Sequence, residues 1–182
     1  MRIDFPRGST VKARSSHLPA FLRSFGLPFN LVALHPESGR IEVESAEDEA
    51  ALAANMKAMK ERNAMGFNIY FEPNAGAIGS RSSSKDVVLL RAVYGDVDAK
   101  NGKTLDECYA AVRNLPIEPS FTVRTGGGLQ VFYCIDYELM SPASKVLHGT
   151  VGKALRDALD GDAVFDPARM MRMPGFLNHP CK

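Results

Sequence analysis

Apolar residues recur every three or four positions in four segments of the chain, the spacing of a helix with one buried face. Each segment follows a serine or threonine, residue types that cap helix N-termini. We therefore expect helices after Ser16, from residue 45 to about 62, after Thr104, and over 141–161. For the last and longest of them the spacing predicts a buried stripe made of Leu147, Val151, Leu155 and Leu159.

Short apolar or alternating runs bounded by turn residues lie between these helices and predict strands. The runs cover residues 30–34, 40–43, 67–71, 87–97, 120–124 and 129–135. The run over 87–97 is the most apolar and predicts a central strand. The order of elements predicts an α+β fold, in which a mixed sheet carries helices on one face. We expect two parts: a small N-terminal αβ lobe over 1–63 and a larger lobe over 64–182.

Composition narrows the class of protein. The 182 residues are 45% hydrophobic and 24% charged with a net charge of +1, which is ordinary for a soluble globular domain. This balance excludes a histone-like polycation and an acidic disordered tail, but it leaves nucleic-acid binding open, because phosphate responds to local charge. The three cysteines include no CxxC pair, which disfavours a disulfide framework and a cysteine zinc site. Without an apolar leader or a long apolar run, we expect a cytoplasmic protein with no membrane partner.

The first candidate site is a pair of carboxylates, Asp96 and Asp98, at the end of the predicted central strand. Side chains alternate along a strand, so the two aspartates share one face. Two close carboxylates repel unless one is protonated or a cation lies between them, and oxygen ligands suit Mg²⁺ or Mn²⁺. The same pair is also typical of a strand end that turns into a solvated acidic loop, and the pattern alone leaves both interpretations open.

Three further residues are candidates with equally plain alternatives. Asp166 is either a third metal-binding carboxylate or a turn residue that caps the next segment. Arg172 lies between apolar neighbours and needs an anion, which is a protein carboxylate or a phosphate. His179 is a surface histidine or a contact to a triphosphate.

A glycine-rich turn, RTGGGLQ over 124–130, joins two predicted strands. A turn between strands lacks the geometry of a P-loop or a dinucleotide fingerprint, which requires a strand followed by a helix. Its glycines are consistent with an ordinary hairpin turn or with close approach of a ligand to the backbone.

Taken together and in order, four segments resemble the archaeo-eukaryotic primase superfamily, in particular the primase-polymerase domains of phage and plasmid replication proteins. The segments are GFNIYFEPN at 66–74, VYGDVD at 93–98, PSFTVRTGGGLQVFY at 119–133, and DPAR with RMPGFLNH within 166–179. The resemblance implies an RRM-like sheet with helices on one face, joined to an N-terminal αβ unit. It also implies a DNA primase or polymerase that transfers nucleotides on a single-stranded DNA template by a two-metal mechanism, with dNTPs or NTPs as substrates.

By this resemblance, Asp96, Asp98 and Asp166 are the catalytic and metal-binding residues, and the metal is Mg²⁺ or Mn²⁺. The implied nucleotide-binding residues are Arg124, Thr125, Gly127, Gly128, Gln130, Arg172 and His179. Gln130 departs from the family pattern, because many members carry a histidine there, and a glutamine cannot act as a cationic contact to triphosphate.

The resemblance also bears on the state of the protein. We expect a monomer and part of a longer protein, since relatives usually continue into a helical or helicase segment, and a helicase domain or protein is an expected partner. Two other functions stay open. One is a catalytically inert, primase-derived module that binds single strands. The other is a D-x-D metal-dependent nucleotide-sugar transferase, which leaves Asp166 and Arg172 without a role.

Overall fold

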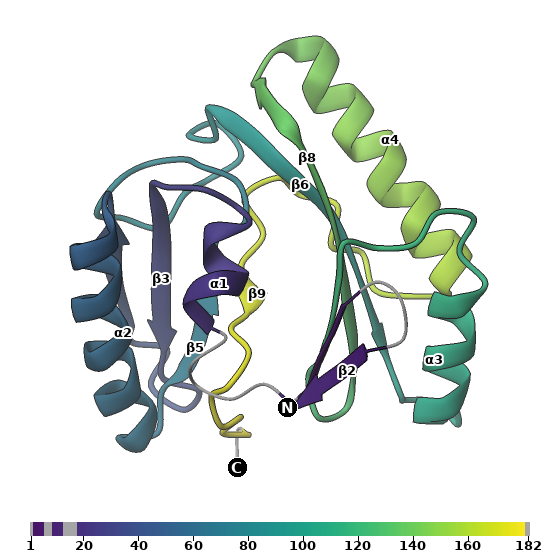
Figure 1. Ribbon diagram of the computed structural model, residues 1–182, viewed down its shortest axis with the longest axis horizontal. Coiled ribbons are helices and arrows are strands. Elements are labelled where there is room, and N and C mark those ends of the chain that lie inside the picture. Colours follow the sequence, from purple (N-terminus) through teal and green to yellow (C-terminus); the bar gives the residue numbers. More distant parts are fainter. Residues whose placement is uncertain (1, 6–8, 13–17, 181–182) are drawn as a thin grey trace.

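The computed structural model describes residues 2–5, 9–12 and 18–180 of the chain. Within these ranges the strands form two antiparallel sheets (Figure 1). The five-stranded sheet has the order β2-β1-β7-β8-β6, with the strands β1 Arg2–Phe5, β2 Ser9–Lys12, β6 Leu89–Asp98, β7 Phe121–Arg124 and β8 Gly128–Leu139. The four-stranded sheet has the order β4-β3-β5-β9, with β3 Phe29–Leu34, β4 Ile41–Ala46, β5 Asn68–Phe71 and β9 Met171–Arg172.

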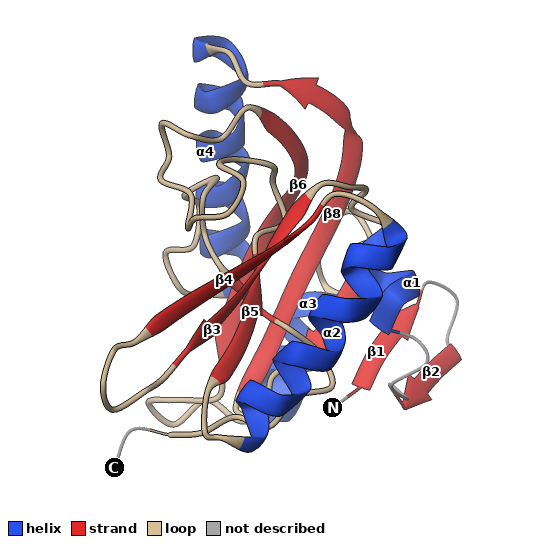
Figure 2. Ribbon diagram, turned by 90° about the vertical axis from the view of Figure 1, so that its left-hand side faces the viewer, coloured by secondary structure: helices blue, strands red, loops and turns tan. Residues whose placement is uncertain are grey.

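The described ranges contain four helices: α1 Leu18–Arg23, α2 Glu49–Ala64, α3 Leu105–Arg113 and α4 Pro142–Leu159. Helix α2 covers the outer face of the four-stranded sheet, and α3 and α4 cover the outer face of the five-stranded sheet (Figures 1 and 2). Helix α1 lies between the two sheets. None of the helices in the described ranges has the length and apolar character that crossing a membrane requires. The expected α+β fold, with helices on one face of the main sheet, is confirmed.

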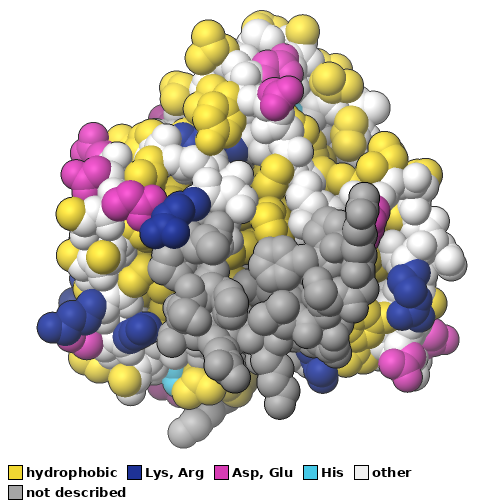
Figure 3. All heavy atoms as spheres, viewed as in Figure 1, with side chains coloured by type: hydrophobic (Ala, Val, Ile, Leu, Met, Phe, Trp, Pro, Cys, Tyr) yellow, Lys and Arg dark blue, Asp and Glu magenta, His cyan; other side chains and the backbone are white. Residues whose placement is uncertain are grey.

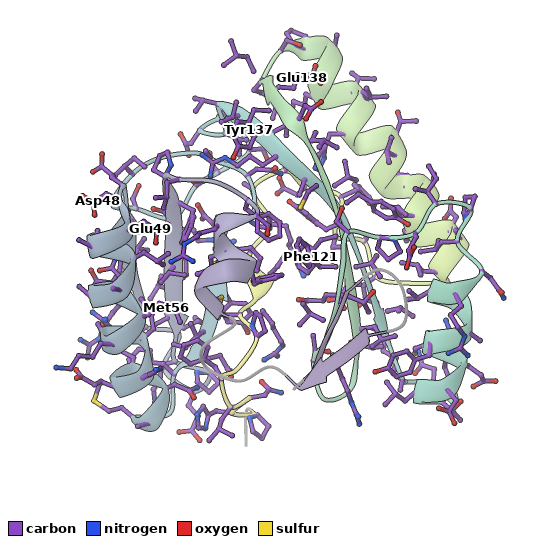
Figure 4. The ribbon with its side chains drawn as sticks, viewed as in Figure 1. Asp48, Glu49, Met56, Phe121, Tyr137 and Glu138 are labelled. Atoms are coloured by element: carbon purple, nitrogen blue, oxygen red, sulfur yellow. The ribbon has the colours of Figure 1, made fainter. Side chains whose placement is uncertain are left out.

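A cluster of aromatic rings joins the two sheets. Phe21 of α1 and Phe25, just beyond its end, contact Phe71 of the four-stranded sheet and Phe132 of the five-stranded sheet, with ring centroids 5.2–5.9 Å apart. Phe121 lies in the middle of the molecule, between the two sheets (Figure 4), 5.4 Å from the Phe21 ring. Burial of large aromatic side chains contributes strongly to stability, so this cluster fixes how the sheets face each other.

Neither sheet follows the expected division at residues 63 and 64. Strand β5, which lies beyond that division, pairs with β3 of the N-terminal hairpin, and β9 extends the same sheet. Strand β1, from the first five residues, pairs with β7. Strand β5 pairs with β3 because β3 is buried along most of its length and therefore needs a hydrogen-bonding partner on both edges.

One helix cap differs from the expectations. Asp48, not Ser45, caps α2 by accepting a hydrogen bond from Ala51 N, at the helix end marked by Asp48 and Glu49 in Figure 4. Ser45 belongs to β4, and its hydroxyl donates to Asn30. The helix predicted after Ser16 is observed from Leu18, while Ser16 itself lies outside the described residues. The expected cap of α3 by Thr104 is present.

Helix α4 has the predicted position but a different buried face. Its buried residues are Ser144, His148, Gly152 and Leu159. Leu147 is 58% exposed and Val151 is 38% exposed, so half of the predicted stripe faces outward. Hydrophobic side chains accordingly gather on the surface over β8 and the first turns of α4 (Figure 3). Gly152 explains the rotation, since a Cβ there would lie 2.4 Å from Cβ of Phe165, and its absence lets the helix approach this segment closely.

Candidate active site

A cavity of about 420 Å³ is lined by residues from both sheets and the loops beside them. Strands β6 and β8 contribute from one sheet, and Tyr70 of β5 and Arg172 of β9 contribute from the other. Three carboxylates and three cationic side chains line it within the described ranges: Asp96, Asp98, Asp162, Lys100, Arg169 and Arg172. The cavity therefore combines possible metal ligands with possible phosphate ligands.

Strand alternation places the first two carboxylates in the cavity. Tyr94 of β6 belongs to the core between the sheets, whereas Val97 belongs to the core under α3 and α4. Asp96 and Asp98 share the face of Tyr94, so both point toward the second sheet. The structure thus brings together the two aspartates that the sequence singled out.

The surroundings of Asp96 disfavour its negative charge unless a cation lies beside it. Burial, together with the neighbouring charge of Asp98, raises the pKa of Asp96 to about 6. Its Oδ2 accepts a 3.4 Å hydrogen bond from Gln130 Nε2, while its Oδ1 is buried and has no hydrogen-bond partner among the described residues. A buried polar atom without a partner is costly, and a bound cation would remove this cost.

Gln130 connects the two sheets at the cavity. It is the cross-strand partner of Asp96 on β8 and is only 4% exposed. Its Oε1 accepts a hydrogen bond of 3.2 Å from the backbone N of Arg172 on β9. Both ends of the amide are therefore engaged, and the residue positions Asp96 and the strand that carries Arg172.

The third carboxylate of the cavity is Asp162, three residues after the last residue of α4. Its backbone N donates a 2.8 Å hydrogen bond to the carbonyl of Asp96. The preceding Gly161 makes this approach possible, because a Cβ there would lie 2.3 Å from the same carbonyl oxygen. The negative charge of Asp162 also contributes to raising the pKa of Asp96.

Asp166, the expected third carboxylate, does not line the cavity. Its Oδ1 accepts hydrogen bonds from the Ser84 hydroxyl at 2.7 Å and from Ala168 N at 3.0 Å. Its backbone carbonyl accepts a 2.6 Å hydrogen bond from the Tyr94 hydroxyl. The geometry is that of a turn residue that caps the next segment, which is the plain alternative noted from the sequence.

Two of the three cationic residues belong to one segment: Arg169 lies just before β9, and Arg172 lies within it. Arg172 places its guanidinium 5.5 Å from the centre of the Tyr70 ring and donates to the Asn178 side chain. Arg169 is exposed at the cavity, and its charge acts to lower the pKa of Asp96.

The third cation, Lys100, follows β6 and lies among the carboxylates. Its Nζ is 2.6 Å and 2.8 Å from the two carboxylate oxygens of Asp162, and 3.8 Å from Asp98 Oδ2. These contacts, led by the hydrogen bond to Asp162, raise the pKa of Lys100, so its side chain stays protonated and positively charged.

The glycine-rich turn lies beside the carboxylates. Thr125 and Gly127 line the cavity, while Arg124 is exposed and lies outside it. Gly128 packs against β6, where an added Cβ would lie 2.3 Å from the Val97 carbonyl oxygen. A side chain at position 128 would therefore disturb the strand that carries both aspartates.

His179 is directed away from the cavity. Its ring Nε2 lies 2.9 Å from the carbonyl of Asn63 at the end of α2, and its backbone pairs with the Asn68 side chain. The residue before it, Asn178, lines the cavity and holds Arg172. The histidine thus fastens the C-terminal segment to the four-stranded sheet.

Sequence reasoning missed Asp162, Lys100 and Arg169. Asp162 follows the glycine at which the last helix was expected to end, and Lys100 is two residues beyond the aspartate pair. Both residues lie close in sequence to an element that contributes to the cavity, and this closeness is the signal that could have identified them. The sequence pattern does not show that their side chains point into the cavity.

No family model matches the chain, and no curated protein sequence is significantly similar to it. Solved structures do share its fold. The primase-polymerase domain of cyanophage S-2L superimposes with a TM-score of 0.62 at 18% identity, over 91% of this chain and 84% of that one.

Primase RepB' superimposes with a TM-score of 0.63 at 21% identity, over 91% of this chain and 51% of that one. The catalytic domain of RepB', solved in complex with initiator DNA, gives a TM-score of 0.57 at 21% identity, over 87% of this chain and 78% of that one. The chain has the fold of archaeo-eukaryotic primase domains such as these.

Proposed function

We propose that this chain is the catalytic core of a DNA primase-polymerase of a phage or plasmid. It would join nucleotides on a single-stranded DNA template by metal-dependent phosphoryl transfer. The observation that carries the proposal is the buried, unpartnered Oδ1 of Asp96, which lies in a cavity with two more carboxylates and with three cationic side chains. The shared fold supports the same class of activity.

Among the described residues, no three Asp, Glu, His or Cys side chains are already grouped as a metal site. The residues that would hold divalent ions are Asp96, Asp98 and Asp162, three carboxylates that line one cavity. Their donor set consists of carboxylate oxygens, which suits Mg²⁺ or Mn²⁺ rather than zinc. When bound, such ions lower the pKa of an attacking hydroxyl and stabilise the charge of the reacting phosphates. Asp96 is the residue most in need of a cation, because burial opposes its negative charge.

The cationic side chains would bind the triphosphate of the incoming nucleotide. Arg172 is fixed from two sides, by Gln130 at its backbone and by Asn178 at its guanidinium, so it presents its charge in one direction. Arg169 is exposed at the same cavity. Arginine donors match the geometry of phosphate oxygens, and a side chain fixed in advance loses less entropy on binding.

The backbone around Gly127 would accept the nucleotide closely. Gly127 has open space where a Cβ would lie, and Thr125, two residues earlier, is buried at the wall of the cavity. A DNA strand is the expected template, which is supported by the fold shared with a RepB' domain solved with initiator DNA. His179 is not included among the nucleotide ligands, because its ring is engaged at α2.

The test is primer extension on a primed single-stranded template with dNTPs and Mn²⁺. We expect extension by the wild type and none by Asp96→Ala combined with Asp98→Ala. The control is Asp106→Ala, an exposed aspartate on α3 outside the cavity, which should extend like the wild type. Absence of extension by the wild type would refute the proposal, as would equal extension by the double variant, because the carboxylates would then have no part in the activity.

A further inference from the structure

Lys100 lies where a cation bridging two carboxylates would lie. Its Nζ contacts both carboxylate oxygens of Asp162, at 2.6 Å and 2.8 Å, and is 3.8 Å from Asp98 Oδ2. No ion pair joins Lys100 to Asp96, although both residues are described and line the same cavity. The ammonium therefore contacts the Asp98 and Asp162 side of the carboxylate cluster directly, whereas it acts on Asp96 only at longer range.

The turn after β6 directs this lysine into the cavity. Lys100 N donates to the carbonyl of Asp98 at 3.0 Å, and the following Asn101 and Gly102 have positive φ angles of 55° and 88°. This tight turn sends the next lysine elsewhere: Lys103 Nζ contacts Asp160 and the last carbonyls of α4. Two lysines of one loop thus have separate roles, and only Lys100 lines the cavity.

We propose that Lys100 is an exchangeable internal cation of the active site. In the metal-free protein it holds Asp98 and Asp162 together against their mutual repulsion. On nucleotide binding its ammonium transfers to the triphosphate, and the position between Asp98 and Asp162 becomes open to a divalent ion. This inference rests on the proposed function, because it assigns a role within the same site.

An order of binding follows from the asymmetry of the cluster. One divalent ion can bind at Asp96 and Asp98 without displacing Lys100, since Asp96 Oδ1 has no partner among the described residues. A second ion must compete with the ammonium for Asp98 and Asp162. Phosphate oxygens remove that competition by taking over the lysine charge, so nucleotide and second ion should bind cooperatively.

The experiment measures Mn²⁺ binding to the metal-free chain by isothermal titration calorimetry and by Mn²⁺ electron paramagnetic resonance. The variants are Lys100→Met, which keeps the length of the side chain without its charge, Lys100→Arg, and the control Lys103→Met. We expect one Mn²⁺ per chain for the wild type, Lys100→Arg and Lys103→Met. For Lys100→Met we expect two, with the second site tightened about tenfold or more.

A non-hydrolysable dNTP analogue completes the test. The analogue should raise the number of Mn²⁺ ions bound per wild-type chain from one to two. The number bound by Lys100→Met should stay at two. Equal Mn²⁺ affinity and number in the wild type and Lys100→Met would overturn the role of Lys100 while leaving the metal site intact. If no variant binds Mn²⁺ with or without the analogue, the proposed function itself fails. Lys100 is half exposed, so circular dichroism should show the Met variant folded.

Discussion

Asp96 is the side chain whose ionisation should report most directly on the cavity. Burial and the charge of Asp98 raise the pKa of Asp96 from 3.8 to about 6. The folded protein therefore binds a proton more readily at this position than the unfolded chain does. The contribution of Asp96 to the free energy of unfolding is greatest below about pH 4 and is lost as the pH rises through about 6.

We predict that Asp96→Asn removes this loss. Above pH 6 and without metal, the variant should be more stable than the wild type by on the order of 2 kcal/mol, because it carries no buried charge. The difference should vanish near pH 4, and Mn²⁺ should stabilise the wild type alone. Urea unfolding in EDTA across this range measures it. A stability difference that does not change with pH would contradict the assignment.

At the scale of residues, the sequence identified part of the cavity. The expected residues that line it are Asp96, Asp98, Thr125, Gly127, Gln130 and Arg172. Asp166 and His179 do not line it, and Asp162 takes the expected place of Asp166. Asp162 and Asp166 are four residues apart in the same loop, and the close approach of Gly161 and Asp162 to the Asp96 carbonyl holds Asp162 at the cavity. Such a contact between distant segments has no local sequence signal.

At the scale of elements, periodicity predicted the helices and most strands but not the rotation of α4. Helical spacing made Leu147 and Leu159 members of one stripe, yet they are 58% and 0% exposed. The buried face instead includes the small residues Ser144 and Gly152, because the helix packs closely against its neighbours. Apolar spacing predicts a buried face only where bulky side chains, rather than close backbone contact, determine the packing.

This difference predicts unequal effects of two substitutions on α4. Leu159→Ala should lower the free energy of unfolding by about 2–4 kcal/mol, because it removes a fully buried side chain and leaves a cavity. Leu147→Ala should change it by less than about 1 kcal/mol, since most of that side chain already contacts solvent. Chemical denaturation of both variants compares them, and a loss for Leu147→Ala as large as that for Leu159→Ala would show that the whole stripe predicted from the sequence is buried.

At the scale of the whole molecule, the order of the elements predicted the fold class. It did not predict that each sheet combines strands from both of the expected lobes. A strand from the N-terminal end joins the five-stranded sheet, while β5 and β9 complete the four-stranded one. This exchange places the cavity between the sheets, with carboxylates from β6 facing Arg172 of β9. Strand pairing over more than 100 residues depends on the shape of the assembled core, which the chain does not encode locally.

The central claim is that Asp96, Asp98 and Asp162 form the catalytic carboxylate cluster. Its most direct test is primer extension with Mn²⁺ by two matched variants, Asp162→Asn and Asp166→Asn. Each removes one negative charge from the same loop, and the asparagine at 166 can still accept the hydrogen bonds from Ser84 and Ala168. We predict that Asp162→Asn lowers the extension rate by about 100-fold or more, while Asp166→Asn stays within a few-fold of the wild type. Loss of extension by Asp166→Asn, with an active Asp162→Asn, would contradict the claim.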